Sequence, residues 1–117
     1  MITEQELKTM VTPETIKKLC ELAEGFEKWE NRESYDPKVW TSSDLVFPLL
    51  IHRTVEGWNN MQVNSENCIV IQDDSVVLWK ENIDDCKTFD FKNYQPENLT
   101  HCELACLHCL IEILKEK

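Results

Sequence analysis

Two helix-start signals open the chain, and the second introduces apolar residues at helical spacing. Thr3 and Glu6 have the spacing of a capping box, in which each side chain binds the other residue's backbone N–H. Thr12 and Pro13 supply an N-cap and a proline at the first helical position, where the missing N–H is harmless. From Ile16 onwards apolar residues recur every three or four positions, to about residue 26. This period predicts an amphipathic helix.

Residues 27–43 show no such period. Their acidic residues and Pro37 favour a loop, whereas the interleaved aromatic residues Trp29, Tyr35 and Trp40 favour an edge strand packed on the core. The sequence does not separate these two interpretations, so both stay open.

A third helical pattern spans residues 45–58, behind the run Ser42-Ser43-Asp44. Pro48 must lie in the first turn of this helix because a proline further inside would break it. The helix therefore begins near residues 45–47, and Asn59-Asn60 supplies its stop. Its polar side carries His52, Arg53, Glu56 and Asn59.

Short apolar runs rich in β-branched residues begin after residue 67. Residues 68–71 and 76–79 are such runs, and the polar stretch 72–75 between them predicts a β-hairpin. Because both runs are apolar on both faces, we expect helices to cover them. Residues 88–92 alternate in polarity and predict a third strand, whereas residues 93–99 predict a turn.

The last helix opens with a second capping box, Thr100 and Glu103. Its leucines and Ile111 form one apolar arc, and the histidines of this helix fall on the remaining side. The elements together predict one domain, residues 1–117, of the α+β class. In this fold, helices pack on a small antiparallel sheet of about three strands, and the C-terminal helix closes it.

Composition then narrows the function classes. The chain has only two glycines, Gly25 and Gly57, and phosphate-binding loops need two or three within a few residues. A net charge of −10 argues against direct binding to nucleic acid. The N-terminal residues are polar and acidic, and no apolar run approaches the length of a membrane span. We therefore expect a cytoplasmic protein that binds neither membrane nor cofactor and keeps its cysteines reduced.

Three stretches of this chain resemble a class of small uncharacterised proteins encoded by bacteriophages and prophages. They are residues 12–19 running into 21–27, residues 48–59, and residues 99–103 ahead of the last helix. The resemblance covers about half the chain, and it consists of helix caps and core spacings rather than chemistry. It implies a phage or its bacterial host as the source. No activity is known for the class, so it implies no functional residue.

Three cysteines of the last helix are the candidate metal ligands. Cys102, Cys106 and Cys109 lie on one helical face, and zinc takes four such ligands, so Cys20, Cys68 or Cys86 would have to supply the fourth. Common structural zinc sites instead use pairs of Cys-x-x-Cys on turns, and the one such pair here lies inside a helix. Free cysteine is also among the most buried residue types. We therefore favour core packing over a zinc-bound domain.

Catalysis is not indicated by any motif. A reactive thiolate belongs at a helix N-terminus, where Cys102 is better placed than Cys106. Carboxylates are numerous and three histidines are present, but no spacing selects an acid and a base. Nucleophile-elbow, metalloprotease and deaminase signatures are absent from the sequence.

Interaction with another protein is the function that the sequence favours. Net charges of −3, −3 and −4 in residues 1–40, 41–80 and 81–117 indicate an acidic surface throughout. We expect Trp40 and Trp58 to lie in an apolar patch for a protein partner or a second copy, with burial in the core as the alternative.

A second interaction hypothesis is DNA mimicry. Here the candidate charge clusters, residues 73–74 and 81–85, would occupy the basic groove of a host nucleic-acid-binding protein. The simpler interpretation of the same acidity is that it keeps the protein soluble.

Overall fold

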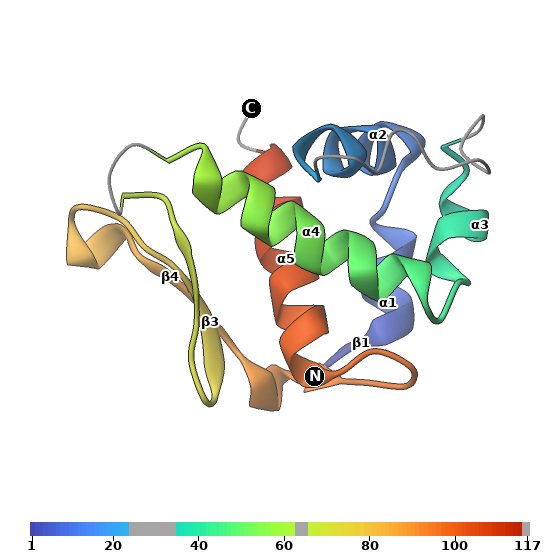
Figure 1. Cartoon of the computed structure of the whole chain (residues 1–117). Coiled ribbons are helices and arrows are strands. Elements are labelled where there is room, and N and C mark those ends of the chain that lie inside the picture. The colour runs from blue at the N-terminus through green and yellow to red at the C-terminus, as the bar shows by residue number, and fades with distance from the viewer. Residues whose placement is uncertain (24–34, 63–65, 116–117) are drawn as a thin grey trace.

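The computed structural model describes residues 1–23, 35–62 and 66–115, and it has an α+β fold (Figure 1). A three-stranded antiparallel sheet lies to one side of the helices, and the C-terminal helix packs against it. The predicted fold class is confirmed.

The first predicted helix start is confirmed at α1 (Glu4–Thr9). The Glu6 N–H donates to the Thr3 hydroxyl at 3.1 Å, and the Glu6 carboxylate accepts from the Thr3 N–H. Directly before it, β1 (Ile2–Thr3) pairs in parallel with β5 (Tyr94–Gln95). The sequence pattern predicts neither strand, because two residues show no period. This pairing holds the N-terminus beside the segment that leads into the last helix.

Helix α2 (Pro13–Leu22) begins behind Thr12, as predicted, and it ends before the predicted limit. The rest of that prediction falls on residues 24–34, outside the described part of the chain. Residues 27–34 of the following segment also lie outside the described part. From residue 35 onwards both interpretations, loop and edge strand, need correction, because α3 (Pro37–Thr41) is a short helix. The Asp36 carboxylate accepts from the Lys38 N–H at 3.0 Å, so aspartate and proline act here as a helix start.

Helix α4 (Val46–Asn60) confirms the third pattern, with Pro48 in its first turn. The Ser43 hydroxyl accepts from the Val46 N–H at 3.1 Å and supplies the start signal. Helix α4 packs on both α2 and α5. At its contact with α2, the Thr54 hydroxyl donates to the Leu19 carbonyl at 3.1 Å. The two helices therefore approach each other closely.

The predicted hairpin is confirmed to within a residue, and the predicted third strand, 88–92, is confirmed but ends two residues early, at Asp90. Strands β2 (Ile69–Ile71), β3 (Ser75–Leu78) and β4 (Lys87–Asp90) pair in that order, all antiparallel. The turns η2 (Ile83–Asp85) and η3 (Phe91–Asn93) flank β4.

The prediction that helices cover both apolar runs is wrong for β2. Helices α4 and α5 contact the sheet from one side, where Ile69, Val76, Leu78 and Phe89 join the core. Val70 on β2 is 38% exposed. The central strand β3, which lies between β2 and β4, is buried along its whole length, whereas the edge strand β2 is partly exposed.

Helix α5 (His101–Lys115) lies at the centre of the molecule (Figure 1). Its predicted capping box is confirmed: the Thr100 N–H donates to the Glu103 carboxylate, and the Glu103 N–H donates to the Thr100 hydroxyl. One side of α5 packs on the sheet and another on α4. This position explains why most of its apolar residues are fully buried: Leu104, Ala105, Cys106, Leu107, Cys109 and Leu110.

Candidate functional site

The three cysteines proposed as metal ligands lie along α5, where Cys106 and Cys109 are buried and Cys102 is half-buried. Burial raises the pKa of the Cys102 and Cys106 thiols. Within residues 1–23, 35–62 and 66–115, no three His, Cys, Asp or Glu side chains gather as metal ligands. The burial of Cys106 and Cys109 supports the core interpretation, and a thiol with a raised pKa is a poor nucleophile.

Thiol labelling of the native protein should divide the six cysteines by position. We expect Cys68, Cys86 and Cys102, which are half-buried, to react before Cys20, Cys106 and Cys109, which are buried. Mass spectrometry of the partly labelled chain identifies the order. Early labelling of Cys106 or Cys109 would contradict the described core.

His108 was assigned to the polar side of its helix, but the structure places it in a partly buried cluster. Its Nδ1 lies 2.8 Å from the Tyr94 hydroxyl, and its ring packs edge-on against Phe89 at 5.0 Å. Nε2 lies 3.7 Å from the Glu112 carboxylate. Burial lowers the pKa of His108 and raises that of Tyr94. The contact between Tyr94 and His108 joins β5 to α5. The Tyr94 side chain is buried and the His108 side chain is only 20% exposed, so the pair offers a substrate little access.

The two tryptophans proposed for an interface both lie in the core. Trp40 is 3% exposed and Trp58 is 7% exposed, and the Trp58 indole N–H donates to the Asn67 carbonyl at 2.7 Å. For these side chains the structure supports the alternative, burial in the core. A buried ring offers a partner no surface, so neither residue enters the proposals below.

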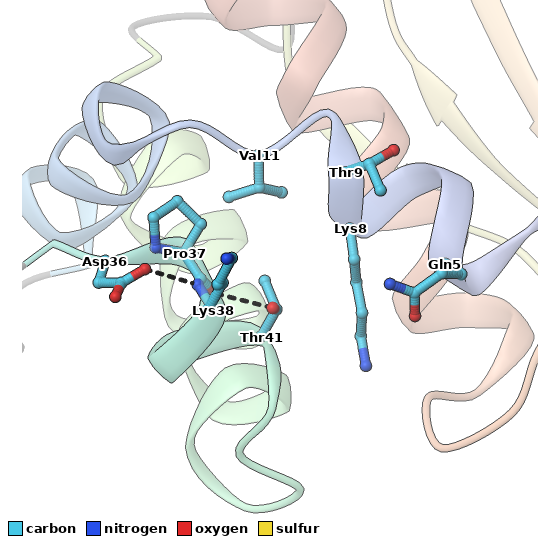
Figure 2. Close-up of a pocket in the computed structure, with 8 residues that line it drawn as sticks. All are labelled: Gln5, Lys8, Thr9, Val11, Asp36, Pro37, Lys38 and Thr41. Atoms are coloured by element: carbon cyan, nitrogen blue, oxygen red, sulfur yellow. Dashed lines mark hydrogen bonds between the residues drawn. The ribbon is translucent and has the colours of Figure 1, made fainter.

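A cleft of about 380 Å³ lies between α1 and α3 (Figure 2). Its polar groups largely serve the fold. Lys8 forms an ion pair with Glu4 at 2.9 Å, Asp36 caps α3, and the Thr41 hydroxyl donates to a carbonyl of its own helix. The Lys38 ammonium lies opposite α1 in this cleft, but the Asp36 carboxylate beside it opposes an anion. This cleft therefore indicates no ligand chemistry.

The strongest concentration of charge lies on the sheet. Residues 66–90 contain seven acids and two lysines, a net charge of −5, which is half the charge of the whole chain. Every exposed ionisable side chain in this stretch is a carboxylate, since Lys80 and Lys87 are both partly buried. We call this region the acidic sheet surface, and its exposed acids are Glu66, Asp73, Asp74, Glu81, Asp84 and Asp85.

These acids lie at the two ends of the hairpin, and an exposed aromatic ring, Trp79, lies at the end that carries Glu66, Glu81, Asp84 and Asp85. Asn67 has a φ of 67°, its N–H donates to the Trp79 carbonyl, and the Trp79 N–H donates to the Cys68 carbonyl. Two residues therefore face Trp79, which is a β-bulge that starts the hairpin. Asp73 and Asp74 form the two-residue turn at the other end of the hairpin. This turn is closed by a hydrogen bond that the Gln72 N–H donates to the Ser75 carbonyl.

Trp79 points to the face of the sheet that the helices leave open. Val76 and Leu78 join the core, so by the alternation of side chains Val77 and Trp79 lie on the opposite, outer face. Val70 pairs with Val77 and lies on the same face. Trp79 is 42% exposed. The sequence pattern pointed instead to two other tryptophans, Trp40 and Trp58. The carboxylates that follow it, from Glu81 to Asp85, were the available signal.

The whole chain was also compared with known proteins: no family model, curated protein or solved structure matches it. No helix in the described part of the chain combines the length and the apolar character needed to cross a membrane. The function is therefore argued from the geometry and charge of the molecule itself.

Proposed function

We propose that this protein acts by binding another protein, and that the acidic sheet surface contacts a basic region of that partner. The observation that carries the proposal is the absence of any exposed cation among residues 66–90, where six carboxylates are exposed. Interspersed charges of both signs would suffice for solubility. A surface of one sign favours and orients a partner of the opposite sign.

Exposed apolar side chains on the same region support a contact surface. Ile83 in η2 is 75% exposed, and Trp79 and Val70 are exposed on the outer face of the sheet. Protein interfaces typically combine a few aromatic or apolar anchors with a polar rim. Carboxylates alone would attract a basic partner, and the anchors would hold it in one orientation.

Charge favours a different protein as partner over a second copy. Two copies would bring the same carboxylates together. Like charges that face each other across an interface destabilise the complex by roughly several kcal/mol. A basic nucleic-acid-binding groove is one partner that fits, which retains DNA mimicry as the second candidate. A reducing, cytoplasmic location is part of the proposal and rests on the sequence alone. A phage or bacterial host source rests on the sequence resemblance.

Affinity capture with two matched variants tests this function. Each variant removes four exposed negative charges, so the two have the same net charge. The sheet variant carries Asp73→Asn, Asp74→Asn, Asp84→Asn and Asp85→Asn. The control variant carries Glu14→Gln, Glu21→Gln, Asp44→Asn and Glu56→Gln.

We expect wild type and control variant to retain the same basic protein from a bacterial lysate and the sheet variant to lose it. Raising the salt concentration should release that protein, because exposed charge pairs are screened. Equal capture by both variants, or capture of no basic protein, would overturn the proposal.

A further inference from the structure

The outer face of the sheet, rather than its β2 edge, is the surface open to a partner beside Trp79. The edge of β2 is closed at Ile69, where the Asn59 carboxamide acts as a substitute strand. The Ile69 N–H donates to Asn59 Oδ1 at 2.7 Å, and Asn59 Nδ2 donates to the Ile69 carbonyl at 2.9 Å. In the hairpin, Cys68 is hydrogen-bonded to Trp79 and Gln72 to Ser75. Because hydrogen-bonded and non-hydrogen-bonded pairs alternate, the pair of Ile69 with Leu78 is non-hydrogen-bonded, and the backbone groups of Ile69 point away from β3.

Closing this edge leaves too little backbone for an added strand. By the same alternation, Ile71 is the one other residue of β2 whose N–H and carbonyl point outwards, and Asn59 does not cover it. Only Gln72 separates Ile71 from the Asp73-Asp74 turn. An edge closed by a side chain also resists pairing with a second copy. A partner that approaches from the β2 side therefore has to use side-chain contacts on the face of the sheet.

On that face, Trp79 is the aromatic platform. It lies on the same face as Val70 and is its diagonal neighbour across β2 and β3, a position from which an indole ring reaches the neighbouring side chain. The acids of η2 come close to it in the fold, because the Lys80 N–H, next to Trp79, donates to the Cys86 thiol at 3.2 Å, and Cys86 directly follows Asp84 and Asp85. The ring is thus exposed beside carboxylates.

The lysine next to Trp79 in the chain is bound within the bulge. Lys80 follows Trp79, but its ammonium donates to Asn67 Oδ1 at 2.6 Å, an amide oxygen within the bulge. Lys80 therefore supports the backbone turn at Asn67. The carboxylates around Trp79 remain available to a cation from outside.

We propose that Trp79 and the carboxylates beside it bind an arginine side chain of the partner, whose guanidinium stacks on the indole while it contacts a carboxylate. Arginine fits better than lysine because its planar group stacks on aromatic rings and presents paired donors to a carboxylate. The inference rests on the proposed function, and it adds the contact residue and the partner's side-chain chemistry.

Calorimetric titration with hexa-arginine and hexa-lysine peptides tests the inference. The variants are Trp79→Leu, which keeps apolar bulk but removes the aromatic face, and the sheet and control variants described above. We expect wild type to bind hexa-arginine more tightly than hexa-lysine. Trp79→Leu should weaken hexa-arginine about fivefold, the effect of one exposed cation–π contact of about 1 kcal/mol, and should leave hexa-lysine nearly unchanged.

The outcomes separate the two proposals. Unchanged hexa-arginine affinity in Trp79→Leu, with loss of affinity in the sheet variant, would overturn the arginine site and leave the proposed function standing. Equal affinities of sheet and control variants would count against both. A Trp79→Leu protein with unaltered melting temperature confirms that lost affinity is not lost folding.

Discussion

Gly57→Ala is expected to destabilise the protein by about 3 kcal/mol and to lower its melting temperature by at least about 10 °C. In an isolated helix the same substitution stabilises by about 1 kcal/mol, because alanine is the better helix former. The expected effect thus has the opposite sign to that of helix propensity. Thermal unfolding followed by circular dichroism measures it.

The reason is the close approach of α2 and α4. A methyl group on Gly57 would fall inside contact distance of the Leu22 carbonyl oxygen and 2.8 Å from the Leu22 carbonyl carbon. Both atoms belong to the backbone of the last turn of α2, so no side-chain rotation relieves the clash. One turn away, the Thr54 hydroxyl lies 2.7 Å from the Leu50 carbonyl of its own helix and 3.1 Å from the Leu19 carbonyl of α2, a further close contact between the two helices.

Glu56→Ala is the matched control for this prediction. Glu56 is exposed and precedes Gly57 in the same helix, so its replacement tests the helix without the contact to α2. We expect its effect to stay within about 0.5 kcal/mol, as for most surface substitutions. A Gly57→Ala protein that melts at or above the wild-type temperature would show that α2 and α4 are further apart than described.

Local signals in the sequence predicted much of the fold. The capping boxes at Thr3 and Thr100 and the start at Thr12 lie within four residues of the groups that they bind, so their spacing alone specifies them. The same holds for the hairpin, where a two-residue turn joins adjacent strands. The short helix α3 escaped prediction because five residues show no period, although Asp36 and Pro37 form the start signal used elsewhere.

Contacts between distant segments could not be predicted in this way. In the sequence, Gly57 is only one of two glycines, whereas the structure shows that it allows the carbonyl of Leu22, on another helix, to approach. Which tryptophans are buried likewise depends on the packing of whole elements: Trp58 faces the core, and Trp79 lies on a sheet face that the helices leave open. The acidic sheet surface needed both the charge count, visible in the sequence, and the burial of the two lysines, visible only in the fold.

Glu4→Gln is expected to destabilise the protein by about 3 kcal/mol, although the substitution preserves size. The Glu4 side chain is 1% exposed, and its Oε1 accepts from the N–H groups of Glu97, Asn98 and Leu99 at 2.8–2.9 Å. Its Oε2 pairs with the Lys8 ammonium at 2.9 Å. Glutamine would weaken the three hydrogen bonds and turn an amide N–H₂ or a neutral oxygen towards a largely buried ammonium. Chemical denaturation at pH 7 measures the loss.

The exposed pair Glu14 and Lys18 supplies the control, because it has the same i,i+4 spacing on the neighbouring helix α2. Glu14→Gln should cost less than about 0.5 kcal/mol, since its pair is exposed and 3.7 Å apart.

The pH dependence of stability gives a second check. Burial acts to raise the pKa of Glu4, but the Leu99 N–H, the Lys8 ammonium and the other two N–H groups outweigh it and hold the pKa below its ordinary value of 4.5. The contribution of this carboxylate is therefore complete above that value and disappears as the pH falls through the lower, folded-state pKa. The difference between wild type and Glu4→Gln should accordingly narrow as the pH falls below 4.5. A difference that stays constant on acidification, or one no larger than that of Glu14→Gln, would mean that the N-terminal helix is not held by this charge.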